Sequence, residues 1–443
     1  MTTKRDKSAS PVGLTSISRI AESTDACRRC GLCSSVCPVF DVLGLECASP
    51  RGKLQLVAAA GQGDLSCTKE LEKALCLCVG CGACSERCPN LVMAKETLLA
   101  AKQVLPGKRP GRVFRIAAGL MSREKTISHA AGIAKSLRPL WASSLPDDQG
   151  LVMRLAKPGA RFPKLAETNL KKIWPRNEKN GKPVSLMPRD GSPNAIAGIF
   201  PGCIHTYLTP KAGISLARVL AAAGFRVDLL ENTGCCGLPA LSAGNTKQAQ
   251  KAMAHNLDVI DIEKYSVIVT PCASCAAMLK VHYPALASKT GYNQAGIAER
   301  LAAKVQVLSQ VLAKHTGKIA QREKVTKEGT ETIAYHTPCH LAKALGDSTS
   351  GPKVMQRIEN AGYRQTKPAC CGQGGLFGVE NPEISGKIGS KAAKILLGTG
   401  ASTVATECSG CYLQLYDLLW RENRKAEVIW LAEAIERFGL AGT

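Results

Sequence analysis

Short apolar runs alternate with helical segments along residues 194–443, and the alternation occurs twice. Each half has three short runs typical of buried strands: "AIAGIF" (195–200), "RVDLL" (226–230) and "VIVT" (267–270), then "TIAYHT" (332–337), "RQTK" (364–367) and "TVATE" (403–407). Helices are expected from Pro210 to just before Gly224, from Pro352 to just before Gly362, and over about residues 247–260 and 383–397. Strands that alternate with helices predict a parallel sheet with right-handed crossovers in each half.

Cysteines mark the two halves as a tandem repeat. Five cysteines of the first half recur in the second half at offsets of 135 or 136 residues. In the predicted topology they follow strand ends at one edge of each sheet, the edge where open parallel sheets bind ligands. We therefore expect three separate loops to build one site in each half. The first cysteine set is Cys203, Cys235, Cys236, Cys272 and Cys275, and the second cysteine set is Cys339, Cys370, Cys371, Cys408 and Cys411.

Two further cysteine motifs precede the repeat, "CRRCGLCSSVCP" at 27–38 and "CVGCGACSERCP" at 78–89. Each fits the C-x2-C-x2-C-x3-C-P pattern of bacterial 4Fe-4S proteins, in which the fourth cysteine ligates the other cluster. Zinc also binds Cys-x2-Cys pairs, but its four ligands leave the third and fourth cysteines of each motif unexplained. We therefore expect two 4Fe-4S clusters. Their ligands would be the first ferredoxin set, Cys27, Cys30, Cys33 and Cys88, and the second ferredoxin set, Cys78, Cys81, Cys84 and Cys37.

The insert between the two motifs, "CTKELEKALC" at 67–76, places Leu71 and Leu75 one helical turn apart. This spacing favours the helical kind of dicluster ferredoxin over the compact hairpin kind. The remaining cysteines, Cys47, Cys67 and Cys76, are expected to be ordinary buried thiols.

Composition limits the cellular setting and the chemistry. The chain has 443 residues, 45% of them hydrophobic, which is enough for several domains with their own cores. The start, "MTTKRDKSAS", has no apolar signal region, and there is no apolar run of membrane-spanning length, so a cytoplasmic chain is expected. Structural disulfides are rare in that compartment, and metal ligation is the leading explanation for 21 cysteines.

Positive charge is concentrated in the middle of the chain. The net charge is +23, and residues 101–190 contain 19 Lys and Arg against 6 Asp and Glu. Helical spacing of Phe114, Ala117 and Leu120, and later of Ile133 and Leu137, suits either an anionic membrane surface or packing on the ferredoxin unit with a solvated cationic face. Nucleic acid is not an expected partner, because no recognised binding module accompanies the charge.

The adjacent cysteines in each repeat need a separate explanation. A disulfide between neighbours is strained, and five thiolates exceed the four that zinc or a plain cubane cluster takes. Gly237 and Gly372 permit a sharp turn and a close approach of the backbone to an inorganic core. The excess of thiolates indicates an unusual iron-sulfur cluster. His205, His336 and His340 lie beside these cysteines, either as cluster-tuning groups or as ordinary hydrogen-bonded loop residues.

The arrangement C, CCG, C-x2-C, present twice, resembles the cysteine-rich CCG domains of heterodisulfide reductase, where such a set holds a non-cubane 4Fe-4S cluster. With the ferredoxin motifs in front, the chain resembles the fused form of the heterodisulfide reductase subunits and the iron-sulfur subunits of anaerobic glycerol-3-phosphate dehydrogenase and glycolate oxidase. "FPGC" (200–203), "CCGLPALSAG" (235–244) and "CASCAAMLKVHYP" (272–284) look like the lactate-utilisation and glycolate-oxidase branch. Glycolate oxidase iron-sulfur subunits often lose cysteines from these sets, whereas both sets are complete here.

The resemblance implies an electron-transfer subunit of a flavin-dependent glycolate or D-lactate oxidase or dehydrogenase. It would pass electrons from an FAD-containing dehydrogenase subunit toward quinone or another carrier, with one or two further clusters in the CCG domains. The chain has no G-x-G-x-x-G fingerprint for a flavin or nicotinamide, so the substrate-oxidising cofactor is expected on the partner. A quinone-reducing or membrane partner would place it on the inner face of the cytoplasmic membrane. The alternatives are a heterodisulfide-reductase-like disulfide reductase and a glycerol-3-phosphate dehydrogenase iron-sulfur subunit.

These observations predict a multidomain protein, with a helical dicluster ferredoxin followed by two tandem α/β CCG domains. The expected boundaries are a flexible tail (1–20), the ferredoxin domain (21–105), a basic helical linker region (106–193), the first CCG domain (194–330) and the second CCG domain (331–443).

Overall fold

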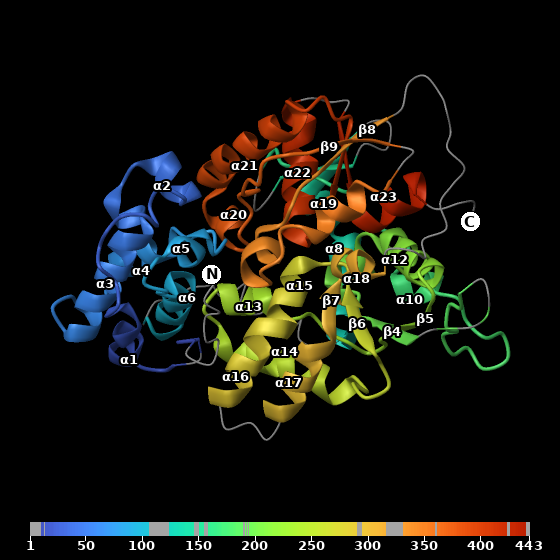
Figure 1. Cartoon of the computed structure of the whole chain (residues 1–443), viewed down its shortest axis with the longest axis horizontal. Coiled ribbons are helices and arrows are strands. Elements are labelled where there is room, and N and C mark those ends of the chain that lie inside the picture. Colours follow the sequence, from blue (N-terminus) through green and yellow to red (C-terminus); the bar gives the residue numbers. More distant parts are fainter. Residues whose placement is uncertain are drawn as a thin grey trace.

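The computed structural model describes residues 10–12, 14–105, 124–145, 150–154, 158–188, 191, 193, 195–289, 295–315, 331–358, 361–422 and 426–439. Figure 1 shows an N-terminal unit in blue at one end of the molecule, beside a first repeat in green to yellow and a second repeat in orange to red. The N-terminal unit comprises residues 10–105, the first repeat 195–315 and the second repeat 331–439. The described residues 124–188 are called the basic segment.

Helices are the regular elements in the described part of the N-terminal unit. In α4, which spans the insert between the two motifs as predicted, the Thr68 hydroxyl accepts a hydrogen bond from the Leu71 N–H at 3.3 Å. Leu71 and Leu75 of α4 pack into a core with Ile20. Ile20 belongs to α1, which begins at Ile17 within the range predicted as a tail. The helices are α1 (Ile17–Ala21), η2 (Glu22–Thr24), α2 (Pro38–Leu43), η3 (Glu46–Ala48), α3 (Pro50–Gln62), α4 (Lys69–Cys76), α5 (Ala83–Arg87) and α6 (Ala94–Val104).

The first repeat is a parallel sheet of four strands in the order β5-β4-β6-β7. Its strands are β4 (Ala195–Ile199), β5 (Phe225–Leu229), β6 (Val267–Thr270) and β7 (Val305–Val307). Its helices are α11 (Gly202–Tyr207), α12 (Pro210–Ala222), α13 (Leu238–Ser242), α14 (Thr246–Val259), α15 (Ala273–Ala277), η5 (Met278–His282), α16 (Tyr283–Lys289), α17 (Ala295–Lys304) and α18 (Leu308–Lys314). The predicted parallel sheet is confirmed, and β7 is an edge strand that the sequence pattern did not reveal.

The second repeat has the same topology, in the order β9-β8-β10-β11, with all strands parallel. Its strands are β8 (Thr332–Tyr335), β9 (Gly362–Arg364), β10 (Thr403–Thr406) and β11 (Glu427–Trp430). Its helices are η6 (His340–Ala344), α19 (Ser350–Met355), α20 (Phe377–Glu380), α21 (Pro382–Leu397), α22 (Ser409–Glu422) and α23 (Leu431–Phe438). Helix α19, the counterpart of α12, is shorter than predicted, and Gly362 begins β9 instead of following a helix.

The two repeats share one hydrophobic core. Helix α12 packs against α23, and α18 packs against α19. Ile199 and Leu216 of the first repeat lie in the same buried cluster as Tyr335, Val354 and Ile435 of the second. Because burial of such side chains is the main favourable term in folding, the repeats are expected to stabilise one another.

The basic segment is only partly helical. It contains α8 (Glu124–Ser136), α9 (Arg138–Trp141) and α10 (Leu170–Ile173), together with a three-stranded antiparallel sheet that was not predicted, β1 (Ala142–Ser144), β2 (Leu151–Met153) and β3 (Arg161–Phe162). Helix α8 contacts α11 of the first repeat. Ile133 and Leu137 are exposed, whereas Phe114, Ala117 and Leu120 lie outside the described residues.

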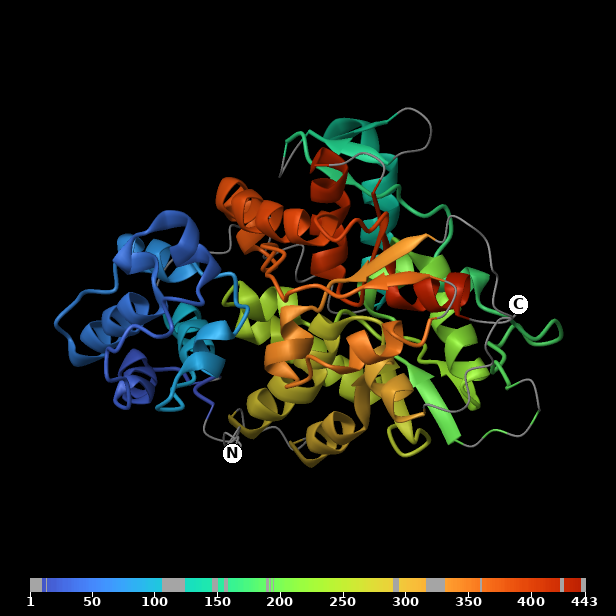
Figure 2. The same ribbon diagram turned by 45° about the horizontal axis from the view of Figure 1, so that its top comes forward.

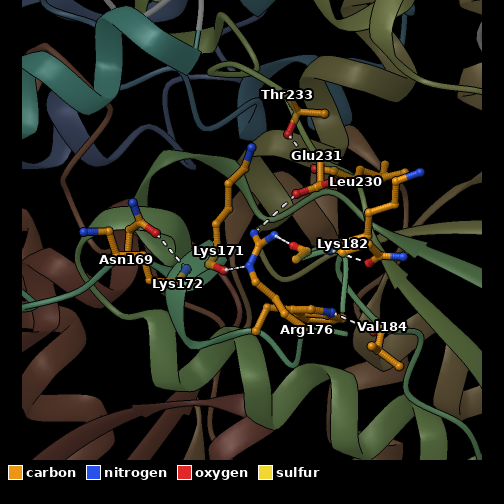
Figure 3. A network of polar contacts seen from close by, with 12 residues as sticks. Asn169, Lys171, Lys172, Arg176, Lys182, Val184, Leu230, Glu231 and Thr233 are labelled. Carbon is orange, nitrogen blue, oxygen red and sulfur yellow. Dashed lines mark hydrogen bonds and ion pairs between the residues drawn. The ribbon is translucent and has the colours of Figure 1, made fainter. Parts of the chain in front are cut away.

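Polar contacts attach the basic segment to both repeats. The Arg161 N–H donates to the Asp417 carboxylate of α22 at 2.8 Å. On the other side, the Arg176 guanidinium donates to the Lys171 carbonyl and forms an ion pair with Glu231 at 3.5 Å (Figure 3). It also donates to the Gly181 carbonyl. Glu231 lies on the loop that runs from β5 to the adjacent cysteines of the first set. The basic segment therefore contacts the loop after β5, one of the loops on which the cysteines lie.

The N-terminal unit contacts both repeats, and Figure 2 shows it beside them in a second view. Helix α2 packs on α21 of the second repeat, and Val39 and Val79 join Phe377 and Ile388 in one buried cluster. An ion pair of 2.5 Å joins Asp41 to Lys391 across the same junction. Among the described helices, none is both long enough and apolar enough to cross a membrane.

Candidate iron-sulfur centres

The first ferredoxin set comes together from two motifs that are far apart in sequence. Cys27, Cys30 and Cys33 lie between η2 and α2, and Cys88 is the residue at which α5 ends. The pKa of the Cys33 thiol is raised, first by burial and then by the negative charge of Cys27, and Cys88 acts in the same direction. Cys30 is exposed, so this set lies at the surface of the N-terminal unit.

The second ferredoxin set also crosses between the motifs. Cys37 is the N-cap of α2, and Cys84 lies within α5. Burial raises the pKa of the Cys84 thiol, and so do the charges of Cys78, Cys81 and Cys37. The structure therefore brings Cys37 toward the cysteines of the other motif, the arrangement expected when the fourth cysteine belongs to the other cluster.

A buried lysine beneath the second ferredoxin set was not identified from the sequence. Lys53 of α3 is only 1% exposed, and its ammonium donates to the Ala48 carbonyl at 2.5 Å and to the Leu77 carbonyl. Burial lowers the pKa of Lys53, while the charges of Cys78 and Cys37 oppose that shift. Lys53 thus fixes the backbone just before Cys78 and places a positive charge near two thiolates. In the sequence Lys53 lies between the two ferredoxin motifs, in "SPRGKLQL" at 49–56, and this position was the available signal.

Neighbouring Arg51 has a different role. It is partly exposed and forms a bidentate pair with Glu46, at 2.8 and 3.0 Å. It therefore binds a carboxylate within its own unit.

The first cysteine set gathers at the carboxyl ends of β4, β5 and β6, as predicted. Hydrogen-bond contacts with Cys203 and then Cys236 lower the pKa of the Cys235 thiol, and Cys272 contacts Cys275. Contact with Cys235 raises the pKa of Cys236, which also contacts Cys275. The five thiols thus form one connected group, and all except Cys203 are buried.

A left-handed glycine follows the adjacent cysteines in each repeat. Gly237 has φ 90° and Gly372 has φ 82°, and their N–H groups donate to Cys235 at 3.5 Å and to Cys370 at 3.4 Å. A Cβ at Gly372 would lie 2.4 Å from the Ser385 carbonyl oxygen. The turn that was expected from the sequence is therefore present in both repeats.

The second cysteine set forms two adjoining groups at the same edge of its sheet. Cys370 contacts Cys339, and Cys411 contacts both Cys371 and Cys408. His336 joins the group of Cys371, Cys408 and Cys411. One ring nitrogen of His336 and the sulfurs of Cys371 and Cys411 all lie within 4.8 Å of one another. Cys370 and Cys371 are neighbours in the chain and link the two groups.

Contacts between sets run in one order through the molecule. Contact with Cys370 of the second cysteine set lowers the pKa of Cys81 in the second ferredoxin set to about 7. Cys408 of the second cysteine set contacts Cys272 of the first. The second cysteine set therefore lies between the second ferredoxin set and the first cysteine set.

Serine residues contribute donors across the boundary between the repeats. Ser409 donates to the Cys272 sulfur through its N–H at 3.3 Å and its hydroxyl at 3.2 Å. Reciprocally, the Ser274 hydroxyl lies 3.1 Å from the Cys408 sulfur and 2.7 Å from Nδ1 of His340. Such donors stabilise charge on sulfur. They were not identified from the sequence, because the pairing depends on how the repeats dock.

The other titratable groups of this region are deeply buried. His205 lies against Trp430 with ring centroids 4.0 Å apart, and burial lowers its pKa to about 4. Burial raises the pKa of Glu407 to about 7, and its carboxylate accepts hydrogen bonds of 2.5 Å from Ser309 and Tyr335.

The three leftover cysteines are not the buried thiols that were predicted. Cys47 is exposed, and Cys67 and Cys76 are only partly buried. Cys47 lies in η3, Cys67 lies just before α4, and Cys76 is the last residue of α4.

The donor sets fit iron-sulfur clusters. Each gathers four or five thiols without a carboxylate, which is the ligand chemistry of these clusters. Residues 197–280 and 333–416 each match the family model of the cysteine-rich CCG domain, and residues 23–92 match the 4Fe-4S dicluster domain. The chain belongs to the CCG-domain iron-sulfur proteins. The matched ranges include all eight ferredoxin cysteines and all ten cysteines of the repeats, so the N-terminal unit is a dicluster domain with two 4Fe-4S clusters and the repeats are the first and second CCG domains.

Curated relatives match different shares of the chain. The probable glycolate oxidase iron-sulfur subunit of Bacillus subtilis is 23% identical over 91% of this chain and 90% of its own length. Lactate utilization protein A 2 of Bacillus cereus is 27% identical over 54% of this chain and 97% of its own length. One subunit of the fumarate reductase (CoM/CoB) of Methanothermobacter marburgensis is 29% identical over 52% of this chain, but the match covers only 44% of that subunit.

Proposed function

We propose that this protein is the iron-sulfur electron-transfer subunit of a flavin-dependent 2-hydroxyacid oxidase or dehydrogenase, with glycolate or D-lactate as the substrate class. The observation that carries the proposal is the order of contacting thiol sets, from the second ferredoxin set through the second cysteine set to the first cysteine set. Cys84 of the second ferredoxin set also lies in a buried cluster against which Cys27, Cys33 and Cys88 of the first pack. Relatives named for glycolate oxidase and lactate utilization support the substrate class.

Each thiol set is assigned to one centre. The first ferredoxin set, Cys27, Cys30, Cys33 and Cys88, holds one cubane cluster, and the second, Cys37, Cys78, Cys81 and Cys84, holds the other. The first and second cysteine sets each hold a further cluster, of the non-cubane kind. Clusters of this class accept and release single electrons at potentials set by burial and by hydrogen bonds to sulfur.

The protein's own residues would tune and protect these sites. Burial of most of the CCG cysteines limits their contact with water, the Ser409 donors stabilise charge on Cys272, and Lys53 offsets charge near Cys37 and Cys78. None of these groups is placed to activate a hydroxyacid, and the sequence has no flavin-binding fingerprint. The substrate-oxidising step therefore belongs to an FAD-containing partner subunit.

A disulfide reductase related to heterodisulfide reductase is the second candidate. Both cysteine sets are complete, and seven of their ten cysteines are buried, although a subunit that only passes electrons on requires neither. The relative named as a fumarate reductase (CoM/CoB) subunit supports this second candidate.

An activity comparison separates the two functions. The full chain is purified anaerobically, alone and together with a flavin-containing dehydrogenase subunit from the same organism. Dye reduction driven by glycolate or D-lactate, and only when both proteins are present, is the expected result. Oxidation of the reduced chain alone by a disulfide, without any response to a hydroxyacid, would replace the proposed function with the reductase.

A further inference from the structure

His336 is a buried histidine that lies against the thiols of the second cysteine set. It is only 3% exposed, and one of its ring nitrogens and the sulfurs of Cys371 and Cys411 all lie within 4.8 Å of one another. Cys411 also contacts Cys408. Imidazole nitrogen and thiolate sulfur both bind iron in proteins, so this part of the second CCG domain offers a mixed group of donors.

One nitrogen of this imidazole has no partner in the protein. Nε2 of His336 is buried and makes no hydrogen bond with any of the described residues. Buried polar atoms in folded proteins are usually satisfied, because an unsatisfied one loses its hydrogen bonds to water without compensation. A bond to a metal ion would satisfy the imidazole.

Strand pairing fixes His336 beside the thiols. It directly follows β8, its N–H donates to the Ala405 carbonyl at 2.9 Å, and its carbonyl accepts a hydrogen bond of 3.3 Å from the Thr406 hydroxyl. Ala405 and Thr406 belong to β10, the strand that leads to Cys408. Paired strands therefore hold the imidazole and the C-x2-C loop side by side, which is the kind of rigid support that metal sites require.

The first CCG domain has no counterpart of this histidine. The first cysteines of the two sets, Cys203 and Cys339, are offset by 136 residues, and the same offset places Phe200 at the position of His336. Phe200 is fully buried in the hydrophobic core of the first CCG domain, and a phenyl ring does not bind iron. The two CCG domains thus differ in their donors although their cysteines correspond.

We propose that His336 is an iron ligand of the cluster in the second CCG domain, beside Cys371 and Cys411. This inference rests on the proposed function, and it makes the two CCG centres electronically different. In Rieske centres, histidines that replace cysteines on one iron raise the reduction potential, because a neutral ligand stabilises the oxidised iron less than a thiolate does. His336 should likewise make the second CCG cluster easier to reduce than thiolates alone would.

Pulsed EPR of the full chain, prepared anaerobically with histidine that carries the heavy nitrogen isotope, tests the inference. A nitrogen bound to iron couples to the unpaired electron far more strongly than a nitrogen that is only hydrogen-bonded to sulfur. We expect one strong nitrogen coupling on a CCG signal, altered by the isotope. The coupling should be absent in His336→Phe, which introduces the side chain found at position 200.

A second variant and a matched control separate ligation from packing. His336→Cys supplies an anionic ligand, so the cluster should be retained with a lower reduction potential. His205→Phe is the control, because His205 is also buried but packs on Trp430 with ring centroids 4.0 Å apart. It should leave the nitrogen coupling unchanged. Iron and zinc are measured for every variant, and if the His336→Phe protein loses its cluster, His336→Cys and the control decide.

Four results would overturn the inference. They are the absence of a strong nitrogen coupling in the iron-loaded chain, its persistence in His336→Phe, an unchanged reduction potential in His336→Cys, and zinc in place of iron in the second CCG domain, since cysteines with one histidine also suit zinc. Hydroxyacid-driven dye reduction with the flavoprotein is measured separately. If it persists in any of these cases, the proposed function stands and only the histidine ligand is lost. If the coupling is found but no hydroxyacid is oxidised, the proposed function is lost instead.

Discussion

At the scale of single residues, the fourth cysteine of each ferredoxin motif decides how the clusters are built. Cys37 lies toward Cys78 and Cys84, and Cys88 lies toward Cys33, so proximity in sequence is a poor guide to shared ligation. A chain that folds in this way needs both motifs for either cluster, and loss of one motif would abolish both.

Paired cysteine substitutions test this crossing. In Cys37→Ala/Cys78→Ala both changes affect one cluster, and the protein should lose about four irons. In Cys27→Ala/Cys37→Ala both clusters are affected, and it should lose about eight irons. Iron analysis of anaerobically reconstituted protein provides the measurement. Ligation within each motif would give the reverse pattern.

Lys53 is the second residue whose contacts lead to a quantitative expectation. Lys53→Met removes the ammonium and with it two charged hydrogen bonds to backbone carbonyls. This should cost roughly 3 kcal/mol, at about 1.5 kcal/mol for each bond. The denaturant midpoint at which the ferredoxin absorbance is lost reports the change. Arg51→Met, which breaks an exposed ion pair, is the matched control and should cost less than about 1 kcal/mol. Equal shifts in the two variants would show that Lys53 has no special role.

At the scale of elements, the βα units of the repeats were predictable, because each strand ends just before a cysteine and each helix begins with its own signal. The edge strands β7 and β11 were missed, since short segments such as "VQV" have no periodicity to distinguish them from the end of a helix. The small sheet β1-β2-β3 was missed for a similar reason, as its strands have only two or three residues.

The Cys-Cys-Gly turn gives a prediction at this scale. Gly237→Ala places Cβ 3.3 Å from the Ala249 carbonyl oxygen, whereas Gly372→Ala places it 2.4 Å from that of Ser385. The first change should cost about 1–2 kcal/mol from the left-handed backbone alone. The second should prevent the second CCG domain from retaining its cluster. Gly400→Ala, at φ 76° with no atom within 4 Å of the new Cβ, is the control for backbone strain. Thermal stability and iron content together measure the outcome, and an equal response of Gly372 and Gly400 would contradict it.

At the scale of the whole molecule, function depends on the junctions between domains. The contacts Cys81–Cys370 and Cys272–Cys408 both cross domain boundaries, as do the Ser274 and Ser409 donors. The sequence predicted eighteen cysteines as cluster ligands, and the structure gathers them into four sets. The order of the sets could not be predicted, because docking is decided by apolar faces whose partners lie hundreds of residues away.

Docking of the dicluster domain should depend on apolar contact more than on charge. Ile388 is 3% exposed between Val39, Val79 and Phe377, so Ile388→Asp would bury an unpaired charge and should release the dicluster domain from α21. Asp41→Asn removes an exposed ion pair and should cost less than about 1 kcal/mol. Small-angle scattering and limited proteolysis report the release. If the Asp41 variant opens the molecule while the Ile388 variant remains closed, charge determines the junction.

Metal analysis combined with low-temperature EPR of the anaerobically purified full chain tests the proposed function most directly. We predict about eight irons in the dicluster domain, additional iron that is lost when Cys236 is replaced by alanine, and signals from reduced clusters that interact magnetically. A colourless protein that contains zinc and gives no EPR signal would contradict the assignment of every thiol set to an iron-sulfur centre.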